Sequence, residues 1–113
     1  MKKWLYLDDV RATPTGFDIR AYTAKGAIDH LSRGDITGCS LDHDLGGEFD
    51  LPESEVGNGY QVACWIEEQA RLGKLNRITC MIHSANPVGA MKMKEALIRA
   101  MGYWHMASFD PCI

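Results

Sequence analysis

Short apolar runs rich in β-forming residues alternate with segments of helical periodicity along the 113-residue chain. The predicted strands span residues 3–7, 18–23, 36–41, 77–82 and 103–109. The predicted helices span residues 24–33, 60–72 and 85–102. This alternation predicts an α/β fold with a mostly parallel sheet and right-handed crossovers. Because the length is typical of one domain, we expect residues 1–113 to form a single domain.

An acidic, glycine-rich segment, residues 44–59, interrupts this alternation. Its sequence is DLGGEFDLPESEVGNG, and connections of this length are unusual in so small a domain. The composition fits a solvated loop, and it also fits a lid that closes on a substrate. We therefore predict a loop insertion here and leave both interpretations open.

The last predicted helix has clear start and stop signals. Asn86 is a suitable N-cap with Pro87 at the first helical position, and Gly102 is predicted to end the helix. Four apolar residues of this helix are expected to face the core: Met91, Leu97, Ile98 and Met101.

Composition excludes several classes of protein. Hydrophobic residues make up 46% of the chain, which is enough for a packed core. The net charge of −3 argues against binding to an extended nucleic-acid duplex. No apolar stretch is long enough for a membrane span, and the amino terminus turns acidic too soon for a signal peptide. The four cysteines lack zinc-site spacing and are expected to be reduced thiols. We expect a cytoplasmic protein, in a bacterial or viral host cell.

Polar side chains follow three of the predicted strands at the point where each strand ends. These groups are Asp8-Asp9, Asp42-His43-Asp44 and His83-Ser84. In a parallel α/β sheet, ligands bind beyond the carboxyl ends of the strands. The sequence therefore predicts one polar site assembled from three strand ends.

The carboxylates at two of these strand ends indicate a cation site. Asp8, Asp9 and Asp42 would repel one another unless a cation lay between them, and an oxygen-preferring ion such as Mg²⁺ or Mn²⁺ suits them. The alternative is that Asp8 and Asp9 only cap the loop after the first strand.

His43 and His83 are candidate proton-transfer groups because histidine titrates near neutral pH. Their position at predicted strand ends favours this role. The alternative for each is a histidine that only makes structural hydrogen bonds at the end of a strand.

Three further residues could bind a phosphate group. Ser84 and Asn86 lead into a helix N-terminus, which attracts phosphate, and Arg11 could fork onto a phosphate. Each also has a structural alternative: helix capping for Ser84 and Asn86, and an ion pair with a neighbouring aspartate for Arg11.

Four separated segments resemble, in type and order, the signature segments of the cyclic-phosphate processing receiver domains. They are LYLDDVR, SLDHDLGG, GYQVACWI and HSANPVGA, and the resemblance covers roughly residues 3–102. That family is related to the phosphoacceptor receivers of two-component signalling. The resemblance implies a flavodoxin-like, doubly wound sheet with strand order 2-1-3-4-5.

The resemblance also implies roles for individual residues. It places the receiver acidic pair at Asp8 and Asp9, the phosphoacceptor carboxylate at Asp42 and the small hydroxyl residue at Ser84. The cyclic-phosphate branch adds the following likely site residues: Arg11, His43, Asp44, His83 and Asn86. The role that it implies is hydrolysis or processing of cyclic phosphates on nucleotides or RNA ends.

Two features depart from a signalling receiver. Only 32 residues separate Asp9 from Asp42, so the first helix is expected to be missing or reduced to a turn. The last candidate strand is followed by no lysine, which a signalling receiver uses to hold the phosphoryl group.

These features lead to one functional hypothesis and two alternatives. We expect a metal-dependent phosphoesterase that acts on a cyclic-phosphate nucleotide or RNA end. The first alternative is a degenerate receiver that acts as a phosphoacceptor or interaction module. The second is a nucleotide binder without turnover.

Overall fold

The computed structural model describes residues 3–47 and 51–108. The strands are β1 (Trp4–Leu7), β2 (Ile19–Ala21), β3 (Gly38–Leu41) and β4 (Thr79–Ile82). The helices are α1 (Ala24–Leu31), α2 (Glu53–Val56), α3 (Gly59–Arg71) and α4 (Pro87–Ser108). Within the described residues, no helix is long and apolar enough to span a membrane.

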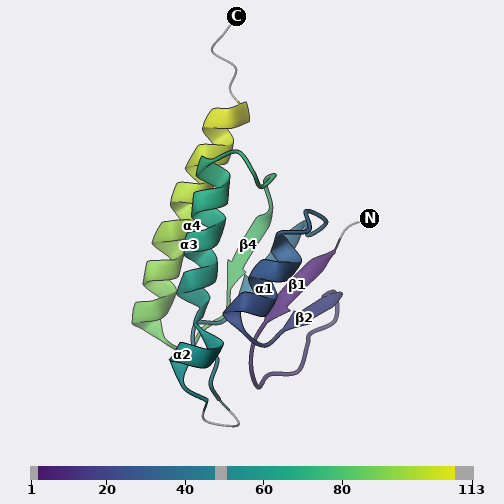
Figure 1. Ribbon diagram of the computed structural model, residues 1–113, viewed down its shortest axis with the longest axis vertical. Coiled ribbons are helices and arrows are strands. Elements are labelled where there is room, and N and C mark those ends of the chain that lie inside the picture. Colours follow the sequence, from purple (N-terminus) through teal and green to yellow (C-terminus); the bar gives the residue numbers. More distant parts are fainter. Residues whose placement is uncertain (1–2, 48–50, 109–113) are drawn as a thin grey trace, which may run out of the picture.

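The described strands form one parallel sheet in the order β2-β1-β3-β4 (Figure 1). This confirms the α/β class and the first four positions of the predicted order. In the register of the sheet, Leu7 lies opposite Leu41, and Leu41 lies opposite Ile82. The next residue of each strand segment is polar, so the sheet brings Asp8, Asp42 and His83 to one edge.

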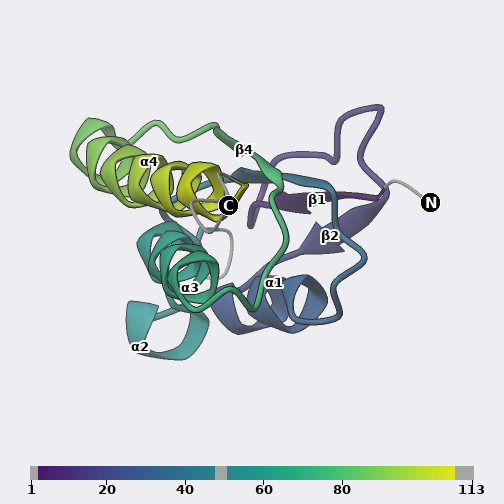
Figure 2. The same ribbon diagram turned by 90° about the horizontal axis from the view of Figure 1, so that it is seen from above.

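The hydrophobic core lies between the sheet and the helices on one of its faces. Figure 2 shows α1 and α3 on this face, with α4 packed along α3. Strand residues Leu5, Leu7, Cys39 and Leu41 are fully buried and pack with the helical residues Leu31, Val62, Ile66 and Met93. These buried apolar residues therefore fix the positions of β1 and β3, the strands that end next to Asp8 and Asp42.

No helix forms between β1 and β2, as expected from the short spacing between Asp9 and Asp42. Residues 8–18 form a loop that lies on the other side of the sheet from α1 and α3 (Figure 2). Phe17 anchors this loop by edge contacts with Trp4 and Tyr6, at ring-centroid distances of 6.0 Å and 5.1 Å. An aromatic cluster thus replaces the first helix of the predicted fold.

The predicted fifth strand was wrong for the residues that the structure describes, because α4 continues to Ser108. Gly102 lies inside this helix and does not end it. The reason is a helical stripe of buried residues that passes beyond the glycine: Met93, Ala96, Leu97, Ala100 and Trp104. The Trp104 indole Nε1–H donates to the Leu75 carbonyl at 2.8 Å, which fixes the end of α4 to the loop before β4.

The predicted core face of this helix was also wrong at three of its four positions. Leu97 is buried, whereas Met91, Ile98 and Met101 are half or more exposed. The buried stripe is rotated relative to the predicted one, because small alanines at two positions let α4 approach α3 closely.

Trp104→Phe is expected to lower the free energy of unfolding by about 1–3 kcal/mol, because the Leu75 carbonyl would lose its partner in a buried place. Urea unfolding followed by circular dichroism measures this change. The exposed Met106 on the same helix is the matched control, and Met106→Ala should leave the midpoint unchanged. Equal midpoints for both variants would contradict a stabilising role of the indole hydrogen bond.

Candidate functional site

Three side chains converge at the carboxyl edge of the sheet. Asp8, Asp42 and His83 each place one ligand atom within 4.8 Å of the others. Asp8 is fully buried and Asp42 is 9% exposed. Two buried carboxylates with an imidazole beside them form a donor set that could hold a metal ion.

Asp8 is held as a charged carboxylate by the loop that follows it. Its Oδ1 accepts hydrogen bonds from the backbone amides of Val10 and Arg11, both at 2.9 Å. Its Oδ2 lies 2.9 Å from Nε2 of His83. Burial alone would raise the pKa of Asp8, but these amides and His83 together hold the pKa below its ordinary value.

The pKa of Asp42 is shifted in the opposite direction from that of Asp8. Burial raises its pKa, and the nearby charges of Asp8 and Asp9 raise it further. The backbone amide of His43 donates to its Oδ1 at 2.8 Å and only partly offsets these effects. The site therefore places Asp8, which the surrounding protein stabilises as an anion, beside Asp42, which a bound cation would stabilise as an anion.

This raised pKa has a consequence for stability in the absence of metal. A carboxyl group whose pKa is higher in the folded state than in the unfolded state binds protons better when folded, so the free energy of unfolding falls as pH rises from its ordinary pKa through its raised pKa. Asp42→Asn is therefore expected to raise the melting temperature at neutral pH in a chelator. At acid pH, where Asp42 is protonated, this gain should disappear. A lower melting temperature of the variant at neutral pH would contradict the shift.

Asp9 lies outside this cluster. Its Oδ2 accepts a hydrogen bond from the backbone amide of Gly47, which ties β1 to the beginning of the 44–59 segment. A Cβ atom at position 47 would lie 2.2 Å from the same oxygen, so a larger residue there would displace the Asp9 side chain. The predicted role of Asp9 as a metal ligand stays a prediction.

His83 is held from several sides. Its Nδ1 lies 2.6 Å from the Ser40 hydroxyl, and its ring stacks on Tyr6 at 4.4 Å between centroids. The Arg11 guanidinium donates to its backbone carbonyl at 2.7 Å. Sequence reasoning missed Ser40 and Tyr6. A serine inside the apolar run ITGCSL was the one available signal.

His43, Asp44 and Asn86 form a second group beside the first. Nδ1 of His43 lies 2.8 Å from Oδ1 of Asp44, and the Asn86 amide donates to the same oxygen at 3.3 Å. The hydrogen bond from His43 lowers the pKa of Asp44. The ring of His43 packs on Gly89, where a Cβ atom would lie 2.5 Å from the ring carbons. The segment that follows β3 and the start of α4 therefore meet here.

The predicted phosphate-binding residues make structural hydrogen bonds as well. The Asn86 side chain accepts from the amide of Gly89 at 2.9 Å, which caps α4, and the Ser84 hydroxyl accepts from the amide of Asn86 at 3.1 Å. Nε of Arg11 lies 4.0 Å from Oδ2 of Asp8. The structure therefore shows both structural alternatives, which are hydrogen bonds at the helix start for Ser84 and Asn86 and an ion pair with Asp8 for Arg11. Phosphate binding by these residues stays a prediction.

The acidic segment contains one short helix and closes at its base. α2 lies in its second half, and Asp44 and Asn58 form an antiparallel bridge. Residues 48–50 lie outside the described residues. A cavity of about 240 Å³ lies between this segment and Asp9, and its lining includes Tyr22, Leu45, Leu51 and Val56.

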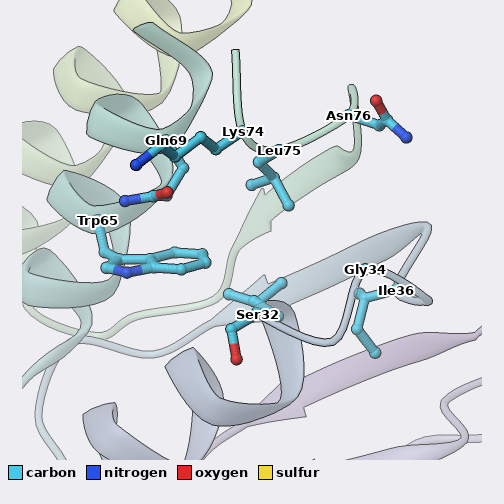
Figure 3. A pocket seen from close by; sticks show the side chains of 9 residues that line it. Ser32, Gly34, Ile36, Trp65, Gln69, Lys74, Leu75 and Asn76 are labelled. Atoms are coloured by element: carbon cyan, nitrogen blue, oxygen red, sulfur yellow. The ribbon is translucent and has the colours of Figure 1, made fainter. Parts of the chain in front are cut away.

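A cavity of about 320 Å³ lies at the opposite end of the sheet. The lining residues Ile36 and Leu75 precede β3 and β4, so this cavity is remote from the carboxylate cluster. Figure 3 shows the Trp65 ring along its wall, and Gln69 and Lys74 also line the cavity. None of the predicted site residues lines it.

Comparison with known proteins gives one match. The model of a protein family described as "Cyclic-phosphate processing Receiver domain" matches residues 3–99. This span runs from β1 into α4 and includes every predicted site residue. No curated protein and no solved structure gave a significant match.

Proposed function

The chain belongs to the cyclic-phosphate processing receiver domain family, and from this membership and the geometry of the site we propose that it is a metal-dependent phosphoesterase. Its substrate is a cyclic phosphate on a nucleotide or on an RNA end. The observation that carries the proposal is the convergence of Asp8, Asp42 and His83 at the sheet edge, with His43 on the neighbouring segment.

Asp8 and Asp42 would hold the divalent cation, Mg²⁺ or Mn²⁺, and Asp9 would join them by releasing the amide of Gly47. The opposed pKa shifts of Asp8 and Asp42 support this assignment, because a cation would stabilise both as anions. When bound, such an ion polarises a phosphoryl oxygen and lowers the pKa of a coordinated water molecule.

The residues around the cation would bind and orient the phosphate. His43 and His83 would act as general base and general acid. One would accept the proton of the attacking water, and the other would stabilise the charge on the leaving oxygen. Arg11 and Ser84 would stabilise the negative charge that develops on the phosphoryl oxygens. Asp44 and Asn86 would orient His43 through the hydrogen bonds that they already form.

The cavity of about 240 Å³ beside Asp9 supports a nucleoside as the rest of the substrate. Its lining is mostly apolar, and Tyr22 at its rim is exposed enough to stack with a base. A substrate whose phosphate lies at the carboxylates could therefore extend its base toward this cavity.

Metal add-back tests the proposal. Chelator-treated protein is mixed with a 2′,3′-cyclic nucleotide, a 3′,5′-cyclic nucleotide or an oligoribonucleotide that ends in a 2′,3′-cyclic phosphate, and products are separated by ion-exchange chromatography. We expect a monoester product from at least one substrate with Mg²⁺ or Mn²⁺ and none in chelator. Turnover that persists undiminished in chelator would contradict metal dependence.

A phosphoacceptor is the second candidate function, because Asp42 occupies the strand end beside the acidic pair, as in receivers. It requires that acetyl phosphate with Mg²⁺ add the mass of one phosphoryl group to the intact protein, and that Asp42→Asn abolish this gain. No gain in mass would favour the phosphoesterase. Tight nucleotide binding without any product would instead favour a binding module.

A further inference from the structure

We propose that Arg20 binds a second phosphate group of the substrate, on the 5′ side of the nucleotide whose cyclic phosphate reacts. Tyr22 stacks with the base of the same nucleotide, so the substrate is a nucleotide unit that carries phosphate on both sides of its sugar. Neither residue belongs to the four segments that resemble receiver domains. The inference rests on the proposed function for the identity of the reacting phosphate, whereas the binding of the second phosphate is tested on its own.

The sheet places Arg20 beside the carboxylate cluster. β2 is the edge strand that pairs with β1, and Arg20 lies opposite Tyr6 in their register (Figure 1). The pairing continues past the end of β1, because the backbone amide of Asp8 donates to the carbonyl of Ala21 at 3.2 Å. The Arg20 side chain therefore lies next to the segment that carries Asp8.

The Arg20 guanidinium is bonded only to uncharged acceptors among the described residues. Its Nε and Nη2 donate to the backbone carbonyl of Asp8 at 3.0 Å and 2.8 Å, and its Nη1 donates to the Thr13 hydroxyl at 2.9 Å. Within the same residues, Arg20 forms no ion pair. A guanidinium has five N–H donors, so two remain without a protein partner. A charged fork with free donors is a binding group for phosphate.

Arg11 has a different position at the same edge of the sheet. Its Nε lies 4.0 Å from Oδ2 of Asp8, and its Nη1 donates to the backbone carbonyl of His83 at 2.7 Å. Arg11 therefore lies at the cluster itself, whereas Arg20 lies on the β2 side of Asp8. Two guanidinium groups at different positions match a ligand with two phosphate groups rather than one.

Two tyrosine rings hold the Arg20 guanidinium in place. Its Cζ lies 5.3 Å from the centroid of the Tyr6 ring and 4.6 Å from that of the Tyr22 ring. Tyr6 also stacks on the imidazole of His83 at 4.4 Å, so one aromatic ring contacts both the guanidinium and the cluster. A cation that is ordered before binding loses less conformational entropy when it binds an anion.

Tyr22 connects this cation to the cavity proposed for the base. Its side chain is 59% exposed and lines the cavity of about 240 Å³ together with Asp9, the neighbour of Asp8. The 3′ and 5′ oxygens of a nucleotide lie on different sides of its sugar, and the base leaves the sugar at a third position. The carboxylates, Arg20 and the cavity therefore offer one place each for the reacting phosphate, the second phosphate and the base.

Calorimetric titration with product analogues measures binding at the subsite without any turnover. The probes are adenosine 3′-monophosphate, adenosine 3′,5′-bisphosphate and a diadenosine dinucleotide that ends in a 3′-phosphate, each with Mg²⁺ present. We expect the two probes with phosphate on the 5′ side to bind about tenfold more tightly than the monophosphate. Tighter binding of the bisphosphate than of the dinucleotide indicates a free nucleotide as substrate, and the reverse order indicates an RNA end. Equal affinities for all three probes, or no binding, would overturn the proposal.

Variants assign the preference to Arg20. Arg20→Gln should lower the affinity for the two probes with a 5′ phosphate about tenfold and leave that for the monophosphate within a factor of about two. The matched control is Arg33→Gln, at an exposed position after α1, which should keep the preference. Tyr22→Ala should weaken the binding of all three probes alike, because each contains the base. A preference that survives in Arg20→Gln would overturn the proposal. Equal losses for all three probes in that variant would also overturn it, since they would show a structural role only.

Turnover separates this proposal from the proposed function. Adenosine 2′,3′-cyclic phosphate is compared with its 5′-phosphorylated form, and the subsite predicts a higher kcat/KM for the second substrate in the original protein but not in Arg20→Gln. A binding preference that depends on Arg20, without hydrolysis of any cyclic phosphate, would refute the phosphoesterase and leave the subsite. Hydrolysis of both substrates at equal kcat/KM would refute the subsite and leave the phosphoesterase.

Discussion

Gly59→Ala is expected to lower the free energy of unfolding by about 3 kcal/mol, because an added Cβ would overlap the backbone at the site. This atom would lie 1.9 Å from the carbonyl oxygen of Asp42 and 2.7 Å from the side chain of Met93. The backbone of β3 cannot yield easily, since Leu41 and Cys39 are fully buried. The start of α3 would have to move away from the end of β3.

The same substitution should also disturb the candidate site. The amide of Gly59 donates to the carbonyl of His43 at 2.9 Å, so a displaced α3 would pull on the segment that carries Asp42 and His43. Thermal unfolding should show a loss of more than about 10 °C. Gly102→Ala is the matched control, because its Cβ would meet nothing within 4 Å and would gain up to about 1 kcal/mol of helix propensity. Similar melting temperatures for the two variants would contradict this account.

Asp42→Asn is expected to reduce the proposed metal-dependent hydrolysis at least about 100-fold, because the residue proposed to bind the cation would lose its charge. The asparagine keeps the size of the side chain and an oxygen that can accept from the amide of His43. The loss should therefore appear in kcat at saturating metal, together with weaker metal binding. In a chelator, it should not be accompanied by a lower melting temperature at neutral pH.

This combination separates a catalytic role from a structural one. A residue needed only for folding would lose activity and stability together, whereas Asp42→Asn should lose activity and become more stable in a chelator. Asp29→Asn, on the exposed surface of α1, controls for the general loss of an acidic group. Turnover of Asp42→Asn within a few-fold of the original protein would contradict the assignment of Asp42 to the metal.

The sequence was sufficient to predict the meeting of Asp8, Asp42 and His83. Each follows an apolar run, and parallel strands of similar length end at the same edge of a sheet. The missing first helix was also predictable, since the chain between Asp9 and Asp42 is too short for it. The first inference needs only the hydrophobic pattern, whereas the second also needs the resemblance to receivers, whose spacing is longer.

The end of the chain was not predictable in the same way. The run YWHMASF has β-forming residues, and periodicity alone does not separate a short apolar strand from a continuing helix. Burial of Trp104 against the loop that contains Leu75 stabilises the helix. This contact joins residues that are 29 positions apart in the chain. The helix at Gly102 therefore continues because of tertiary packing, which outweighs the local stop signal.

The supporting residues of the site were hidden for a related reason. Tyr6 and Ser40 meet His83 only because of the register between β1, β3 and β4. Asp9, next to Asp8 in the chain, turns instead to Gly47 because neighbouring side chains leave a strand end in different directions. Residue type thus predicted which strand ends carry chemistry, whereas the partners of each group required the folded structure.

The most direct test of the central claim is a ³¹P NMR time course with cyclic phosphates. The original protein and Asp42→Asn are each incubated with the same 2′,3′-cyclic nucleotide, 3′,5′-cyclic nucleotide and cyclic-ended oligoribonucleotide, with Mg²⁺ or Mn²⁺ and in chelator. The account predicts that at least one cyclic signal converts to a monoester signal only with metal and intact Asp42. Spectra that stay unchanged for all three substrates, or conversion by Asp42→Asn at the original rate, would contradict it.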